Sequence, residues 1–420
     1  MRGPAASVGV GALCCALVLL TACVATSSGP PPTGPARPST ASSSASPTAS
    51  VPTPTVSASP SATPSTSASC STAGQLAGWS PSRLAAQTVV APVQESDVSL
   101  VRPLVVDGIG GVILFGSAAP PDLGASLAAV SAAAPGVRPL VMTDEEGGVV
   151  QRMANLVGWL PAPRTMAASA TPAQVQRAVY AVALRMRAAG VTMDLAPVLD
   201  LDDGAGPSAT DPDGTRSFSL DPAVATAYGL AFARGLAAAG IVPVAKHFPG
   251  LGRSSGNTDV RPARTLNWAQ LRGAGLEPFV AAVRAGVPAV MVANASVPGL
   301  TTLPASLSPT VMTTVLRGAL GFGGLVLTDS LTAGAIAAAG YPVPQAAVTA
   351  LAAGADMILL GFPGPPSLDA TLQAAQEAAA LARSTQGAIA AAVVDGRLSR
   401  ARLVSAVAHI LAAKQVSLCP

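Results

Sequence analysis

The feature that most constrains the fold is an alternation, from residue 80 onward, of short apolar runs with alanine-rich stretches. Eight runs have the length and composition of buried strands: residues 89–93, 111–115, 140–143, 191–201, 241–248, 289–292, 325–328 and 357–360. The stretches at 172–189, 222–239 and 270–285 are helical in pattern and end before a glycine. Strands alternating with helices predict a single-domain (β/α)8 barrel, the TIM-barrel fold. An open doubly wound sheet is the alternative, but no glycine fingerprint follows the first run.

The chain before this pattern has two parts of different composition. Residues 1–22 combine a basic Arg2 with an apolar run, and end in Leu20-Thr21-Ala22 before Cys23. They resemble a bacterial lipoprotein signal with lipid on Cys23; a plain secretory signal is the alternative. Residues 23–70 are almost entirely Ser, Thr, Pro and Ala, a composition typical of a disordered, flexible tether. We therefore expect an extracytoplasmic barrel at 71–420, lipid-anchored to the cell membrane.

Composition excludes several classes of partner. Half of the chain is apolar, only 11% is charged, and the formal net charge is +3 without a Lys/Arg cluster, so no nucleic-acid partner is expected. His and Cys are too few and scattered for a zinc site, and neither metal nor organic cofactor is predicted. Cys70 and Cys419 bracket the expected barrel, whose first and last elements are neighbours, so we predict a disulfide between them. A monomer is expected.

Polar residues gather where apolar runs end, which is where a parallel barrel carries its function. Asp144-Glu145-Glu146-Gly147-Gly148 leads to Arg152, Lys246-His247-Phe248-Pro249-Gly250 ends the fifth run, and Asp329 ends the seventh. Alone, each has an ordinary structural alternative: a solvated turn, a strand end, or a carboxylate that caps the next helix. Arg216 in Thr215-Arg216-Ser217-Phe218 is by itself an ordinary surface charge.

Taken together, these motifs resemble glycoside hydrolase family 3, specifically its single-domain β-N-acetylglucosaminidases, over roughly residues 75 to 415. The matching patterns are KHFPGxG, DxEGGxVxR, RSF, the DxAPVxD-like segment from Asp194 to Asp200, and the segment ending in Asp329. The resemblance implies that Asp144, Arg216, Lys246 and His247 bind sugar hydroxyls with Arg152 close by. It also implies that Asp329 is the nucleophile, while Asp194 and Asp200 brace the barrel mouth.

The chain departs from the family at the proton donor. Relatives carry a D-S-H triplet on the loop after KHFPG, and Asn257-Thr258-Asp259 stands there in this chain. Asp259 could itself be the acid and base with Asn257 as a neutral partner, or the site could have lost its donor and only bind glycan. Retention of the other polar positions favours an enzyme. A second departure is Asn294, where relatives often carry a histidine.

The expected activity is retaining hydrolysis of a terminal β-linked N-acetylhexosamine through a covalent glycosyl-aspartate. The resemblance favours N-acetylglucosamine, with peptidoglycan fragments as its source. The alternatives are a non-catalytic glycan-binding lipoprotein and a β-glycosidase with another sugar preference. Phosphorolysis is less expected, because a carboxylate base would repel phosphate.

Overall fold

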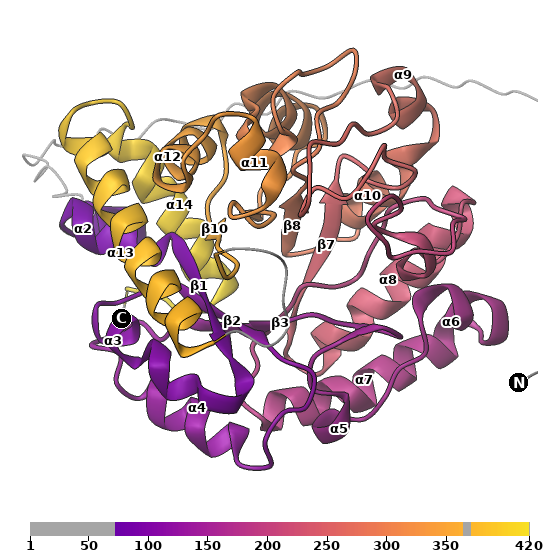
Figure 1. The fold of residues 1–420 in the computed structure, drawn as a ribbon, viewed down its shortest axis with the longest axis horizontal. Coiled ribbons are helices and arrows are strands. Elements are labelled where there is room, and N and C mark those ends of the chain that lie inside the picture. Colours follow the sequence, from indigo (N-terminus) through magenta and orange to yellow (C-terminus); the bar gives the residue numbers. More distant parts are fainter. Residues whose placement is uncertain (1–71, 364–370, 420) are drawn as a thin grey trace, which may run out of the picture. The chain divides into compact units, whose positions relative to one another are not determined.

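The computed structural model describes residues 72–363 and 371–419. Its main sheet has the order β10-β1-β2-β3-β6-β7-β8-β9, and neighbouring strands run parallel. These strands are β1 (Val89–Gln94), β2 (Gly111–Phe115), β3 (Leu140–Thr143), β6 (Met193–Asp194), β7 (Val242–Phe248), β8 (Ala289–Val292), β9 (Leu325–Thr328) and β10 (Ile358–Leu359). Leu327 of β9 also pairs with Met357 beside β10, so the sheet closes on itself. The predicted (β/α)8 barrel is confirmed, with helices around its strands (Figure 1).

Helices connect the strands and cover the barrel. They are α1 (Thr72–Leu76), α2 (Pro81–Gln87), α3 (Arg102–Val106), α4 (Leu123–Ser131), α5 (Ala154–Val157), α6 (Pro163–Ser169), α7 (Pro172–Ala188), α8 (Pro222–Ala238), α9 (Trp268–Gln270), α10 (Glu277–Arg284), α11 (Gly334–Ala338), α12 (Val343–Ala353), α13 (Leu372–Val394) and α14 (Arg400–Ala413). Short 3₁₀ or π segments are η1 (Glu95–Val101), η2 (Gly214–Arg216), η3 (Leu271–Gly275), η4 (Ala305–Leu307) and η5 (Thr310–Ala319). Local signals explain where the long ones begin: Thr171 and Gln174 form a capping box before α7, and Asp221 caps α8.

The barrel interior is a packed apolar core. Inward-facing side chains of the strands meet in one cluster that includes Val90, Met142, Val244 and Leu327. Ile410 of α14 joins this cluster, so the last helix contributes to the same core as the strands. A second, larger cluster packs the outer faces of the strands against the helices.

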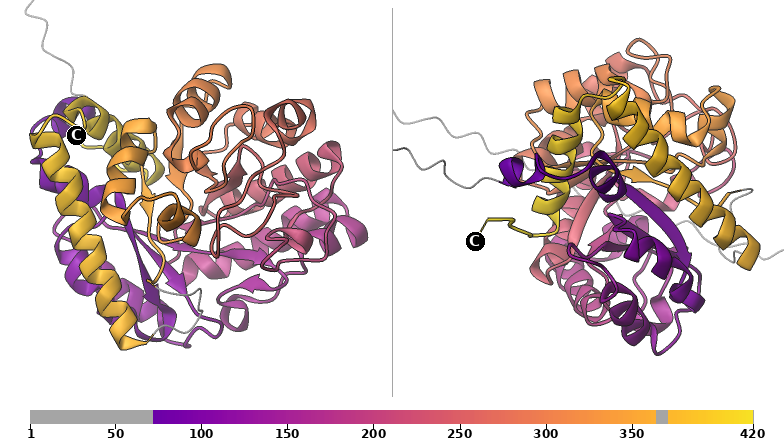
Figure 2. Two further views of the ribbon diagram at one scale, coloured as in Figure 1. Left: turned by 45° about the horizontal axis from the view of Figure 1, so that its top comes forward. Right: turned by 90° about the vertical axis from the view of Figure 1, so that its left-hand side faces the viewer.

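Segments from the two ends of the described chain lie side by side. Helix α13 packs against α2 and β1, and α14 packs against α1 and α2, as Figure 2 shows. Cys23 and Cys70 lie outside the described residues, so the lipid anchor and the Cys70–Cys419 disulfide stay predictions. None of the described helices is long and apolar enough to cross a membrane.

Two expected elements differ from those observed. The run at 191–201 forms strand only at Met193–Asp194, with one further bridge from Val198 to Lys246. Pro197 interrupts this run, and proline cannot donate to a strand ladder. The helix expected at 270–285 is divided into α9, η3 and α10, because Gly275 and the proline at position 278 interrupt regular helix there.

Asp356, just before β10, ties the barrel's last elements together. Its buried carboxylate lies 2.5 Å from Arg317 of η5 and 2.8 Å from Arg402 of α14, and accepts a 2.9 Å hydrogen bond from the Val326 amide. His409 lies 3.0 Å away. One side chain thus joins β9, η5 and α14.

We expect Asp356→Ala to lower the free energy of unfolding by roughly 3–5 kcal/mol, because two guanidinium groups and a buried amide lose their partner. Denaturant titration measures the change. Asp107→Ala is the matched control, since its pair with Arg383 is about half exposed and should contribute less than about 1 kcal/mol. Equal losses in the two variants would contradict this assignment.

Candidate active site

A cavity of about 280 Å³ opens at the carboxyl ends of the strands. All seven residues singled out from the sequence for catalysis or sugar binding line it: Asp144, Arg152, Arg216, Lys246, His247, Asp259 and Asp329. They come from β7, from the ends of β3 and β9, and from the loops between strands. The barrel therefore gathers residues that lie up to 185 positions apart (329 − 144) in the sequence.

Glu146 is the hub of the charges in this cavity. Its carboxylate receives two 2.8 Å hydrogen bonds from Arg216, through Nε and Nη2, and lies 2.6 Å from Lys246 Nζ. Burial works against its charge, but Arg216 and Lys246 more than offset this and lower the pKa of Glu146 to about 2. Glu146 is thus an anion at neutral pH that fixes both cations.

Asp144 shares the same cations. Its Oδ1 lies 2.8 Å from Lys246 Nζ and its Oδ2 lies 3.2 Å from Arg152 Nη2. Burial opposes the charge of Asp144, but Lys246 and then Arg152 outweigh it and hold its pKa well below the ordinary value. The pKa of Lys246 is raised, because its two carboxylate neighbours outweigh the cost of burial. The cavity wall therefore offers fixed donors and acceptors.

A short hairpin places these carboxylates. Strands β4 (Glu145–Gly147) and β5 (Val150–Gln151) are antiparallel and follow β3 directly. The turn between them needs glycine: Gly147 and Gly148 have φ of +102° and +64°, and a Cβ on Gly147 would lie 2.3 Å from the Pro161 carbonyl oxygen. Glu145 points away from the hub and accepts hydrogen bonds from the amides of Arg152 and Met153, both at 2.7 Å. The hairpin thereby carries Arg152 back to the cavity.

His247 is held as a neutral ring by Asp200. Its Nδ1 lies 2.7 Å from Asp200 Oδ2, which also accepts its backbone N–H at 2.9 Å. Burial, together with the charge of Arg216, lowers the pKa of His247 to about 4. If Nδ1 carries the proton donated to Asp200, the unprotonated Nε2 is left to accept a hydrogen bond from a ligand hydroxyl. Asp200 therefore fixes the orientation of the His247 ring and also accepts the Leu251 amide at 2.6 Å, which braces the loop.

Asp213 lies beside Arg216 and His247. It is fully buried, and neither carboxyl oxygen has a hydrogen-bond partner among the described residues. It lies 3.6 Å from Arg216 Nη1 and 3.9 Å from His247 Nδ1. Burial, together with the charge of Asp200, raises its pKa to about 8. At neutral pH it is therefore largely uncharged.

Asp200, Asp213 and His247 are close enough for their ligand atoms to approach one metal ion. The contacts fit such an ion poorly. His247 Nδ1 is already engaged with Asp200, and the guanidinium of Arg216 occupies the neighbourhood of Asp213. We interpret the group as a hydrogen-bonded support for His247.

Asp329 stands at the end of β9 and faces the cavity. Its Oδ1 accepts the Ser330 amide at 2.7 Å, whereas α11 begins after Ala333, so Asp329 does not cap that helix. Asn294, the residue at the second family departure, is buried and donates to the Ser330 carbonyl oxygen at 2.7 Å. Its Oδ1 accepts from Ser306 at 2.6 Å, so Asn294 supports the strand end that carries Asp329.

Asp259 lies on a loop across the cavity, tied to α11. The Asp259 and Thr258 carbonyl oxygens accept the amides of Gly334 and Ala335 at 2.9 and 3.0 Å. The sequence suggested that Asn257 pairs with the Asp259 carboxyl. Instead, Asn257 Oδ1 accepts the backbone N–H of Asp259 at 2.9 Å. Asn257, one of the residues at the first departure from the family, thus fixes the loop backbone. The Asp259 carboxyl stays at the cavity rim.

Two carboxyls of this cavity have raised pKa values. Burial raises the pKa of Asp329, and the charge of Asp259 adds to this rise. Asp259 is exposed at the rim, yet the surrounding protein removes enough water to raise its pKa, a rise that Arg216 opposes. Two like charges that interact do not ionise together easily, so one carboxyl keeps its proton to higher pH than a free aspartate does.

Glu146 and Asp213 were missed from the sequence. The three successive carboxylates at 144–146 gave no sign of which one meets Arg216 and Lys246, because that depends on the hairpin after β3. The resemblance of the segment around Arg216 to a family motif was the available signal that this arginine is not an ordinary surface charge. Asp213 gave no pattern, since it sits in a long loop.

A strand-end cavity with fixed cations, a neutral histidine and two carboxyls of raised pKa is typical of a (β/α)8 enzyme that acts on a polar ligand. Comparison with known proteins agrees. Residues 89–413 match the glycosyl hydrolase family 3 N-terminal domain. The chain belongs to this family and is a glycoside hydrolase.

Individual relatives are similar over most of the chain. The beta-hexosaminidase LpqI of Mycobacterium tuberculosis (strain ATCC 25618 / H37Rv) is 37% identical over 295 residues, which is 68% of this chain and 74% of that protein. A beta-hexosaminidase of Stenotrophomonas maltophilia (strain R551-3) is 36% identical over 322 residues, or 73% and 92% of the two chains. The crystal structure of a family 3 glycosyl hydrolase from Mycobacterium smegmatis str. MC2 155 has a TM-score of 0.70 at 35% identity, covering 80% and 98%.

We expect Glu146→Gln to lower kcat/KM by roughly 100-fold while the fold is kept, because Arg216 and Lys246 lose the charge that fixes them. Steady-state kinetics on an aryl β-glycoside and circular dichroism measure the two effects. Glu277→Gln, at an exposed glutamate in α10, is the matched control and should change neither. A wild-type kcat/KM in Glu146→Gln would show that the charge of Glu146 is not needed to fix Arg216 and Lys246.

Proposed function

We propose that this glycoside hydrolase removes terminal β-linked N-acetylhexosamine, with N-acetylglucosamine as the preferred sugar, by a retaining mechanism. The observation that carries the mechanism is a pair of interacting carboxyls, Asp329 and Asp259, that face one cavity. Retaining hydrolysis needs a carboxylate nucleophile and a second group that first donates and later removes a proton. The names of the relatives support the sugar class, since those at 36–37% identity are beta-hexosaminidases.

The cavity suits one sugar ring at the end of a glycan. Its 280 Å³ lies just below the range of roughly 300–1,000 Å³ that is usual for drug-sized ligands. Aromatic residues are only 3% of the chain, so hydrogen bonds from Asp144, Arg216, Lys246 and His247 would carry recognition. Arg152 positions Asp144 from its far side. A terminal sugar, rather than an internal one, is therefore the proposed substrate.

In the first step Asp329 attacks the anomeric carbon, and Asp259 gives its proton to the leaving oxygen. A raised pKa suits Asp259 to this role, because the acid must still hold its proton when Asp329 is ionised. Formation of the glycosyl ester removes the negative charge of Asp329. Since that charge and Asp259 interact, the pKa of Asp259 then falls, and its carboxylate can take a proton from the attacking water.

Two other functions would use the same cavity. A protein that only binds glycan would keep the hydroxyl-binding residues and lack turnover, and a β-glycosidase of another specificity would keep both carboxyls. The raised pKa values favour an enzyme, because a binding site gains nothing from a carboxyl that holds a proton at the rim. Peptidoglycan fragments are the proposed source of the sugar.

We also propose that the enzyme is lipid-anchored at the outer face of the cytoplasmic membrane through Cys23, supported by the leader and tether composition. Cys23→Ser should release the enzyme into the medium or leave it unprocessed. Detergent partitioning of cell fractions measures this. A processed variant that stays attached to the membrane and still requires detergent for release would rule out the anchor.

Substitution of the two carboxyls should give different results. Asp329→Ala should abolish turnover of every substrate, because no covalent intermediate can form. Asp259→Ala should slow natural substrates by about 100- to 10,000-fold, the usual range for general acid catalysis, but spare dinitrophenyl glycosides, whose leaving group needs no proton. Azide should then restore deglycosylation and yield a β-glycosyl azide. Kinetics with aryl β-N-acetylglucosaminides of graded leaving group provide the measurement.

The pH profile separates Asp259 from a merely structural residue. Because the pKa of Asp329 is raised, the acid limb of kcat/KM should lie above the ordinary 3.8, and activity should rise with pH through it. Protonated Asp259 should set the alkaline limb, which Asp259→Ala removes for dinitrophenyl substrates. An unchanged alkaline limb would place the donor elsewhere, and a wild type that binds sugar without turnover would favour the binding protein.

A further inference from the structure

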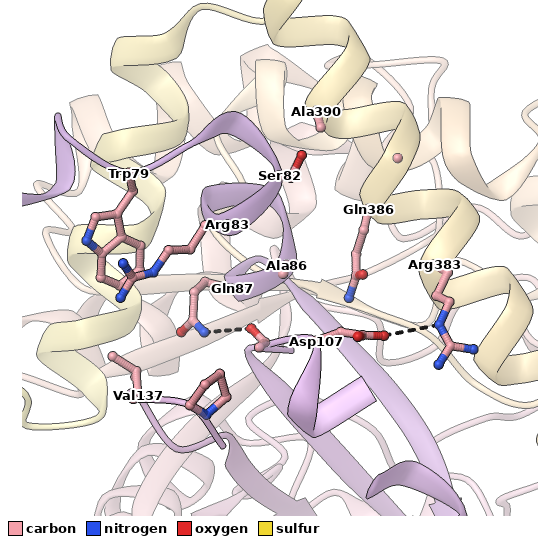
Figure 3. A pocket seen from close by; sticks show the side chains of 14 residues that line it. Trp79, Ser82, Arg83, Ala86, Gln87, Asp107, Val137, Arg383, Gln386 and Ala390 are labelled. Atoms are coloured by element: carbon pink, nitrogen blue, oxygen red, sulfur yellow. Dashed lines mark hydrogen bonds and ion pairs between the residues drawn. The ribbon is translucent and has the colours of Figure 1, made fainter. Parts of the chain in front are cut away.

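Two cavities larger than the catalytic one lie at the opposite face of the barrel. One of about 620 Å³ and one of about 650 Å³ share the lining residues Arg83, Gly136 and Val137. Their walls come from residues that precede strands, such as Gln87 before β1 and Thr192 before β6. Figure 3 shows the first of them, between α2 and α13.

Charges in the second cavity are all of one sign. Four cations line it, Arg83, Arg138, Arg187 and Lys414, and no Asp or Glu is among its lining residues. The three arginines are exposed, and none forms an ion pair with a described residue. The floor is apolar, with Leu140, Val242 and Val416 among others. Among the described residues, the site therefore combines positive charge that no carboxylate neutralises with an apolar base.

Lys414 is the innermost of these cations. Its Nζ donates a 2.9 Å hydrogen bond to Gln87 Oε1. Gln87, which Figure 3 shows, is fixed in turn by donating from Nε2 to the Gly108 carbonyl oxygen at 2.7 Å. Burial lowers the pKa of Lys414 to about 7, with no carboxylate to oppose the shift. An ammonium group has three donors, so two remain for a bound anion.

Helix ends explain only part of this arrangement. Arg187 lies in the last turn of α7 and Lys414 directly follows α14, positions where the helix dipole favours a cation. Arg83 lies in the first turn of α2, where the dipole disfavours one, and Arg138 lies in the loop before β3. The ring of Trp79, 3.5 Å from the Arg83 guanidinium carbon, holds that side chain in place.

We propose that this cationic cavity is a binding site for a phosphate-bearing ligand. Guanidinium groups match phosphate oxygens in pairs, and a doubly charged anion suits a cluster without carboxylates. The volume of about 650 Å³ leaves room for an organic group on the apolar floor. The phosphate could be free in solution or belong to a lipid headgroup. Both faces of the barrel would then bind ligands, independently of one another.

Phosphate binding is tested on the mature chain carrying Cys23→Ser, which has no lipid to interfere. Inorganic phosphate is titrated at constant ionic strength with chloride as reference, by calorimetry and by the NMR titration of the Lys414 side chain. We expect saturable binding, a higher pKa of Lys414 in the presence of phosphate, and about tenfold or greater weakening in Lys414→Met and in Arg187→Gln. Arg284→Gln, at an exposed last-turn arginine of α10, should leave binding unchanged.

Vesicles distinguish the two sources of phosphate. Binding to phosphatidylglycerol but not phosphatidylcholine vesicles, lost in both cavity variants, assigns the site to a headgroup. Saturable binding of inorganic phosphate alone assigns it to a soluble ligand. The proposal is overturned if phosphate and chloride act alike and vesicle binding is absent or insensitive to both variants. Glycosidase activity serves as the folding check, because the cavity lies away from the catalytic residues.

Discussion

The buried carboxylate of Glu146 fixes two cations that the rest of the catalytic face depends on. Arg216 and Lys246 reach it from η2 and from β7, so a single group aligns a long loop with a strand. Burying charges is costly unless each is paired and hydrogen-bonded, and here each cation has at least one close carboxylate. Because the wall is fixed before a ligand arrives, little reorganisation is needed on binding, which is how a preorganised site lowers the barrier.

The cations of this wall divide the carboxyls of the cavity into two groups that differ in the direction of their pKa shift. Asp144 and Glu146 are paired with cations, so their pKa values are lowered and they stay ionised as hydrogen-bond acceptors. Asp329 and Asp259 lack such direct pairing among the described residues, so burial and a neighbouring carboxylate, Asp259 for Asp329 and Asp144 for Asp259, raise their pKa values. One cavity thereby holds carboxylates that only bind and carboxyls that can exchange protons, set by their neighbours rather than by residue type.

Much of the fold and part of the site could be predicted from the sequence. The eight apolar runs specified the barrel, because strand and helix periodicity is local, and the strand ends pointed to Lys246, His247 and Asp329. The pairing of Glu146 with Arg216 could not be predicted, since it joins residues 70 positions apart through a hairpin and a loop. The split of 270–285 into three segments was also missed, although its cause is local: a glycine and a proline lie inside an otherwise helical pattern.

The loop that carries Asp259 offers a physical reason for the departure from the family's proton-donor triplet. A histidine donor needs an acidic partner that orients its ring, whereas a carboxyl needs only a fixed backbone and a pKa raised into the working range. The backbone of this loop is fixed at two points. The Asp259 amide donates to Asn257 Oδ1, and the amides of Gly334 and Ala335 in the first turn of α11 donate to carbonyl oxygens of the loop. Burial, together with the charge of Asp144, raises the pKa of Asp259. In the proposed mechanism, replacing both members of the triplet together keeps a self-consistent donor, which a single replacement would not.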